Sequence, residues 1–185
     1  MKHLLDTILK YVPKNEQEEH DKEQMLRFIE EHPDCLERNN LVGHFTTSIW
    51  TVNKERTKVL LAYHNIYDSW AWIGGHADGE EDLRAVALRE LQEETGVTGG
   101  EIIGDVFSLE TLTVDGHVKK GVWVPSHLHF NLTYLAEADE EEVLRIAEEE
   151  NSAVQWWPLE DVENVSSEPW MVKHIYNKLI KHTRG

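Results

Sequence analysis

Residues 75–97 are the stretch that most constrains what this chain can fold into. They read GHADGEEDLRAVALRELQEETGV, which is a glycine turn, a run with helical character and a second glycine that ends it. Apolar residues recur at helical spacing and predict one buried face. We expect the helix to begin near Gly79 or Glu80. Asp78 and Glu81, three residues apart, form the expected capping pair.

Three carboxylates share one face of this predicted helix. Glu90, Glu93 and Glu94 stand at positions i, i+3 and i+4, within about one turn of each other. An acidic helix face is most often only solvated, because Glu is a good helix former. Hard divalent cations such as Mg²⁺ and Mn²⁺, however, prefer oxygen ligands from a few carboxylates. The spacing alone favours a solvated face, whereas the glycine turn before the helix, the adjacent Arg89 and the glycine that closes the helix favour a metal site.

The same stretch resembles the Nudix box. That pattern is Gly, five residues, Glu, seven residues, Arg-Glu, an apolar residue, any residue, Glu-Glu, any residue, Gly and an apolar residue. Every fixed position is filled here, by Gly75, Glu81, Arg89, Glu90, Leu91, Glu93, Glu94, Gly96 and Val97. The resemblance implies a Nudix-like α/β/α sandwich with a mixed sheet. Composition and periodicity independently favour the α/β or α+β class.

The resemblance also implies an activity and a metal. It implies a Nudix pyrophosphohydrolase, which hydrolyses a diphosphate bond in a nucleoside diphosphate linked to another moiety. Glu90, Glu93 and Glu94 would hold Mg²⁺ or Mn²⁺, and the backbone at Gly75 would complete the metal's ligands. A water activated by the metal would attack phosphorus.

Four further residues receive roles from the same resemblance. Glu81 and Arg89 would fix the helix and orient the metal ligands. Some family members take one more Glu from outside the box, as general base or metal ligand. Glu149 and Glu150 stand in about the right place, just before a predicted strand. The sequence leaves the choice between them open.

Charge and composition limit the partners. The formal net charge is -17, from 35 acidic and 18 basic residues, which argues against binding a nucleic-acid polymer. An anionic small-molecule diphosphate would instead need a metal bridge. The single cysteine, Cys35, excludes a disulfide within the chain and a cysteine-built zinc site. The apolar rhythm of the first residues is broken by charges, so we expect no membrane partner and a cytoplasmic location.

We expect residues 1–40 to form an N-terminal helical extension and residues 41–185 the Nudix hydrolase domain. The extension contains two predicted helices, at 2–12 and 15–32, and it either packs on the core or serves as a lid or homodimer contact. Period-two and β-branched patterns predict strands at 44–53, 58–63, 69–73, 101–114, 127–135 and 153–157. Further helices are expected at 138–150 and 168–182, and residues 116–121 give no clear signal.

The predicted strand at 127–135 has the clearest alternation. It places His127, His129, Asn131 and Thr133 on one side. This side is either the solvated face of an antiparallel sheet or a substrate-binding surface. The candidate substrate-binding residues are His44, His76, His127, His129 and Trp72. A separate metal site built from the same four histidines is a further alternative, without support from local ligand spacing.

The sequence does not identify the substrate. The downstream proline or tyrosine that marks some Nudix subclasses is missing, because Leu112, Thr113, Val114 and Asp115 occupy that region. The main alternative function is a catalytically silent Nudix-like module that binds or senses a ligand. Such modules usually lose a box carboxylate, and none is lost here.

Overall fold

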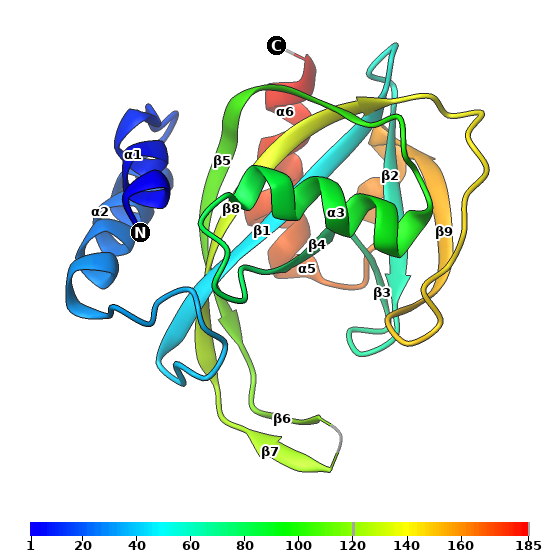
Figure 1. Ribbon diagram of the computed structural model, residues 1–185. Coiled ribbons are helices and arrows are strands. Elements are labelled where there is room, and N and C mark those ends of the chain that lie inside the picture. The colour runs from blue at the N-terminus through cyan, green and yellow to red at the C-terminus, as the bar shows by residue number, and fades with distance from the viewer. Residues whose placement is uncertain (120, 185) are drawn as a thin grey trace. The chain divides into compact units, whose positions relative to one another are not determined.

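The computed structural model describes residues 1–119 and 121–184 (Figure 1). The fold divides into two compact units. The first comprises Met1–Thr47, Gly75–Val86 and Asp105–Thr133, and the second comprises Ser48–Gly74, Ala87–Gly104 and Tyr134–Gly185.

Seven strands form one sheet. They are β1 (Gly43–Asn53), β2 (Lys58–His64), β3 (Ser69–Ala71), β4 (Ile73–His76), β5 (Glu101–Val114), β8 (His127–Ala138) and β9 (Asn151–Pro158). The order is β3-β2-β1-β8-β5, while β4 also pairs with β1 and β9 with β2. The predicted β1–β2 hairpin is confirmed, with Val52 opposite Val59 in an antiparallel register. The strand predicted at 69–73 is two strands, because β3 pairs with β2 whereas β4 pairs with β1.

The two N-terminal helices are confirmed as α1 (Lys2–Lys10) and α2 (Glu16–Glu31), which lie side by side (Figure 1). The fully buried Glu18 of α2 joins them to β5. Its carboxylate accepts hydrogen bonds from Tyr11 Oη at 2.7 Å and from Ser108 Oγ at 2.9 Å. The backbone N–H of Lys14 donates to the same carboxylate at 2.8 Å. These bonds compensate for burying a charged group and hold the helices in the first unit.

The helix of the box, α3 (Leu83–Thr95), begins later than the sequence predicted. Asp82 caps it, because its Oδ1 accepts a hydrogen bond from the Ala85 N–H at 3.1 Å. The expected capping residues are engaged elsewhere: Asp78 pairs with Arg38, and Glu81 pairs with the amino terminus. The helix ends as predicted at a glycine, whose φ of 77° suits a residue without a side chain.

The acidic segment 138–150 is not the helix that we expected. The structure has turns and irregular backbone from residue 139 to 150. Two of its apolar side chains are exposed to solvent, Val143 by 77% and Ile146 by 47%. Helices in proteins depend mainly on burying an apolar face, and this segment buries too little.

A small hairpin joins β5 to β8. It consists of β6 (His117–Lys119) and β7 (Val122–Val124), which pair antiparallel and extend from the ends of β5 and β8 (Figure 1). Residues 116–121 carry no clear pattern in the sequence, which agrees with the exposure of Val118, Val122 and Trp123.

The C-terminal helix is confirmed, with a π-helical interruption. It runs through α5 (Pro169–Met171), η2 (Val172–Tyr176) and α6 (Asn177–Arg184), after the short η1 (Leu159–Asp161) and α4 (Val162–Val165). Val172, Ile175, Tyr176 and Leu179 are buried, whereas Ile180 is half-buried. Over residues 1–119 and 121–184, no helix has both the length and the apolar character needed to cross a membrane.

The polar side of β8 is not a solvated face. Asn131 and Thr133 are buried, and both donate hydrogen bonds to Glu110 Oε2, at 3.1 and 2.7 Å. Thr46 Oγ1 donates in turn to Asn131 Oδ1 at 3.0 Å. These residues therefore form an internal polar network. The alternating sequence pattern indicates which residues share a face of the strand, but it does not indicate what covers that face.

Candidate active site

Three carboxylates from two distant segments meet in the second unit. Helix α3 presents Glu90 and Glu94 one turn apart, and the chain just before β9 supplies Glu150. One carboxylate oxygen of each lies within 4.8 Å of the others. We call these three residues the carboxylate group. Their burial is graded, with Glu94 only 3% exposed, Glu90 half-buried and Glu150 exposed.

The buried member, Glu94, is fixed at two atoms. Its Oε1 accepts a hydrogen bond from the Gly74 N–H at 3.1 Å, and its backbone carbonyl accepts one from Asn151 Nδ2 at 3.0 Å. Burial, together with the nearby Glu150 and Glu90 carboxylates, raises the pKa of Glu94 to about 8, although the Gly74 hydrogen bond opposes the rise. Without a cation, ionising Glu94 near pH 7 is therefore unfavourable, and a bound cation would relieve that cost.

Asn151 was missed by the sequence analysis and organises this turn. Its Oδ1 accepts a hydrogen bond from the Ala147 N–H at 3.1 Å, while the Glu150 N–H donates to the Ala147 carbonyl at 2.8 Å. Asn151 thus ties the turn that carries Glu150 to the end of α3. The signal available in the sequence was its position, an amide at the junction between an acidic run and a predicted strand.

Four histidines gather in the first unit. Ring centroids of His44, His76, His127 and His129 lie 4.8 to 5.1 Å apart in five pairs. Burial lowers the pKa of His129 far below its ordinary value, and the neighbouring histidines lower it further. Burial also lowers the pKa of His44. Both rings are therefore neutral at pH 7, with a nitrogen lone pair available.

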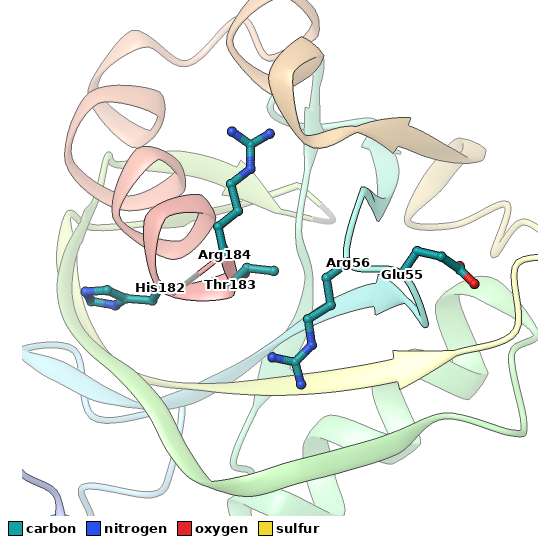
Figure 2. Close-up of a pocket in the computed structure, with 5 residues that line it drawn as sticks. All are labelled: Glu55, Arg56, His182, Thr183 and Arg184. Carbon is teal, nitrogen blue, oxygen red and sulfur yellow. The ribbon is translucent and has the colours of Figure 1, made fainter.

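An open depression also lies in the second unit, lined by Glu55, Arg56, His182, Thr183 and Arg184 (Figure 2). The arginines come from the β1–β2 turn and from α6. None of these residues belongs to the carboxylate group, whose members lie on α3 and just before β9.

Comparison with known proteins decides the family. The NUDIX domain model matches residues 43–181, which is most of the chain. The chain belongs to the Nudix family of hydrolases.

Two curated relatives from Arabidopsis thaliana agree with this assignment. Nudix hydrolase 27, chloroplastic, is 52% identical over 55 residues, which cover 30% of this chain and 24% of the relative. This chain thus spans about a quarter of that relative's length. Nudix hydrolase 25 is 25% identical over 139 residues, covering 70% of this chain and 79% of the relative.

Solved structures agree on the fold. A hydrolase of the NUDIX family from Clostridium perfringens is 21% identical, with a TM-score of 0.55, covering 76% of this chain and 96% of that one. The Ap4A hydrolase of C. elegans in a binary complex is 22% identical, with a TM-score of 0.54, covering 77% and 95%. The expected combination of a mixed sheet with helices is thereby confirmed as a Nudix fold.

The remaining Nudix box residues lie outside the carboxylate group. Glu93 and Arg89 are exposed on α3. Gly75 lies in β4, directly after the glycine whose N–H binds Glu94. Glu81 accepts a hydrogen bond from the His3 N–H at 3.1 Å besides its pairing with the amino terminus.

Two other candidates for this Nudix site are also placed. Glu149 is exposed and does not join the carboxylate group, although it neighbours Glu150. Trp72 packs against the C-terminal helix. Its backbone N–H donates to Tyr176 Oη at 3.4 Å, and the two rings pack edge to face with their centroids 5.7 Å apart.

Proposed function

We propose that this protein is a Mg²⁺- or Mn²⁺-dependent hydrolase of a diphosphate bond in a nucleoside diphosphate linked to another moiety. The observation that carries the proposal is the buried Glu94 carboxylate, held next to Glu90 and Glu150 with ligand oxygens within 4.8 Å. Like charges at this separation repel strongly in a partly desolvated site. A divalent cation removes that repulsion, and the complete Nudix box supplies the family context.

The donor set fits the proposed metal. All three members of the group offer carboxylate oxygen, the ligand type that Mg²⁺ and Mn²⁺ prefer. Glu90, Glu94 and Glu150 would hold the ion, while the box pattern adds Glu93 and the backbone at Gly75 as further ligands. A bound divalent metal would neutralise diphosphate charge and lower the pKa of a coordinated water.

The chain's own residues would divide the remaining work. The Gly74 N–H fixes one oxygen of Glu94, which leaves the other oxygen for the metal. Asn151 holds the end of α3 and the Glu150 turn together, so the group keeps its spacing. Glu150 is the exposed member. With one carboxylate oxygen toward the metal, its second oxygen would remain free to accept the proton of the attacking water as general base, because a general base must reach a solvent-derived nucleophile.

The test is release of the two products, a nucleoside monophosphate and the phosphorylated second moiety, from a panel of nucleoside diphosphate derivatives with Mg²⁺ or Mn²⁺. Ap4A belongs in the panel because a similar fold is that of a C. elegans Ap4A hydrolase. We expect metal-dependent release from one or a few compounds by the wild type, loss of release in Glu94→Gln, and wild-type release in Glu149→Gln. A wild type that binds metal but is inert across the panel would contradict hydrolysis. It would favour the alternative of a silent ligand-binding module.

The location of the protein stays a prediction. The sequence favours the cytoplasm, whereas the name of one relative places that relative in the chloroplast. Fluorescent tagging in the source cells would decide between them.

A further inference from the structure

One polar atom in the first unit is buried without a hydrogen bond. His44 is 3% exposed, and its Nε2 has no hydrogen-bond partner within the described part of the chain. Its other ring nitrogen, Nδ1, lies 3.3 Å from the Asn40 carbonyl. A carbonyl only accepts, so Nδ1 carries the proton and Nε2 holds an unused lone pair. Leaving such a group unsatisfied is energetically costly unless a ligand binds it.

Two further imidazoles present nitrogen atoms beside it. One ring nitrogen from each of His44, His127 and His129 lies within 4.8 Å of the others. His127 Nδ1 lies 2.9 Å from the Pro125 carbonyl, so it too is protonated at Nδ1 and has its lone pair on Nε2. Imidazoles oriented by a backbone carbonyl in this way are the usual arrangement of histidine metal ligands.

The spacing of the nitrogens also fits a metal. His127 Nε2 and His129 Nε2 are 3.2 Å apart. Two nitrogens bound to one tetrahedral Zn²⁺, each about 2.0–2.1 Å from the ion, are separated by about 3.3 Å. The pair therefore already has the spacing of two ligands on one ion.

We propose that His44, His127 and His129 form a second metal site, for Zn²⁺ or a similar transition metal, separate from the carboxylate group. Neutral imidazoles suit these ions and not Mg²⁺, which prefers oxygen. Three protein ligands leave a fourth position open, and His76 packs alongside, 5.0 Å from His129 and 5.1 Å from His44. The site would tie the beginning of β1 to the beginning of β8, just after the β6–β7 hairpin.

The sequence left this cluster open to three uses, as a solvated face, substrate contacts or a metal site. Burial of His44 argues against the first use. Substrate contact would need an accessible donor or acceptor, whereas the unsatisfied His44 nitrogen is buried. The metal site accounts for this nitrogen and for the close His127–His129 pair together.

The test is calorimetric titration of chelator-treated full-length protein with Zn²⁺ in excess Mg²⁺, which occupies the carboxylate group. We expect saturable binding of one Zn²⁺ per chain. His44→Gln and His129→Gln should each weaken binding by more than about 100-fold, because each removes a direct ligand, whereas changing a group in the outer shell typically costs about 10- to 100-fold. His117→Gln is the matched control. It changes a nearby histidine whose Nδ1 bonds the Asp115 carbonyl and which is outside the triad, so it should bind like wild type.

Two results would overturn the proposal. The first is absence of saturable Zn²⁺ binding by the wild type in excess Mg²⁺. The second is Zn²⁺ binding that survives His129→Gln but disappears in Glu94→Gln, which would place the ion on the carboxylates. If the histidine variants fail to fold, zinc-edge X-ray absorption of the loaded wild type decides instead. Imidazole nitrogens at about 2.0–2.1 Å support the site, and a shell of oxygens alone refutes it.

Discussion

The carboxylate group and the histidine cluster are built alike but carry opposite electrostatics. Each joins side chains from distant segments around one buried member, Glu94 in the first case and His44 in the second. Burial raises the pKa of Glu94, where like charges meet, and lowers the pKa of His44, where neutral rings meet. The difference predicts that the carboxylate group would prefer a hard cation and the histidines a borderline one.

The strongest test of this contrast removes one charge from the carboxylate group. Glu94→Gln should lower Mg²⁺-dependent hydrolysis by about 1,000-fold, because a bound metal supplies several kcal/mol of transition-state stabilisation. Zn²⁺ binding measured by calorimetry in excess Mg²⁺ should stay unchanged. If hydrolysis persists in the variant, the carboxylate group is not the site of catalysis.

The second test uses the raised pKa of Glu94 without metal. Its pKa is about 8 in the folded protein against a reference value of 4.5, so the folded state holds a proton that the unfolded state loses. Stability from this group is therefore full below about pH 4.5 and is lost as pH rises through about 8. Denaturant unfolding in the presence of chelator measures this. Between pH 5 and pH 9 the free energy of unfolding of the wild type should fall by on the order of a few kcal/mol more than that of Glu94→Gln.

Glu149→Gln is the control for that stability measurement. It removes a neighbouring carboxylate but leaves Glu94 in place, so it should keep the wild-type dependence on pH. Identical pH profiles for wild type and Glu94→Gln would contradict the assignment of a costly buried charge.

The third test separates two adjacent glutamates. Glu150 belongs to the carboxylate group and Glu149 does not, although both are exposed. Glu150→Gln should weaken Mn²⁺ binding by about 10- to 100-fold, as expected when a metal's ligand sphere is disturbed. Glu149→Gln should bind Mn²⁺ like wild type in electron paramagnetic resonance titrations. Equal weakening by both substitutions would show that only local charge matters.

The smallest expected effect concerns the fourth histidine. His76 packs against His44 and His129 but is outside the triad of candidate ligands. His76→Gln should weaken Zn²⁺ binding by less than about tenfold, since outer groups tune a site rather than form it. The same calorimetric titration measures this, and a loss as large as that of His129→Gln would make His76 a ligand.

Much of the fold followed from local patterns. The β1–β2 hairpin, the N-terminal helices and the C-terminal helix were predicted because each shows a clear apolar period or a capping residue such as Asn15. The helix predicted for the acidic segment around Val143 is absent from the structure, because its apolar side chains are too exposed to stabilise a helix. The exposed β6–β7 hairpin was not predicted, because strands that pair without burying a face show no clear apolar alternation in the sequence.

The sequence alone determined the Nudix box, the helix that carries it and the one-turn spacing of Glu90 and Glu94. These features depend on the helical repeat, which neighbouring residues fix. Only the tertiary structure decided that Glu150 rather than Glu149 joins them, that Asn151 ties the two segments together, and that four histidines meet. Such contacts join residues far apart in the chain. They depend on how turns close and what buries each face, which no local spacing encodes.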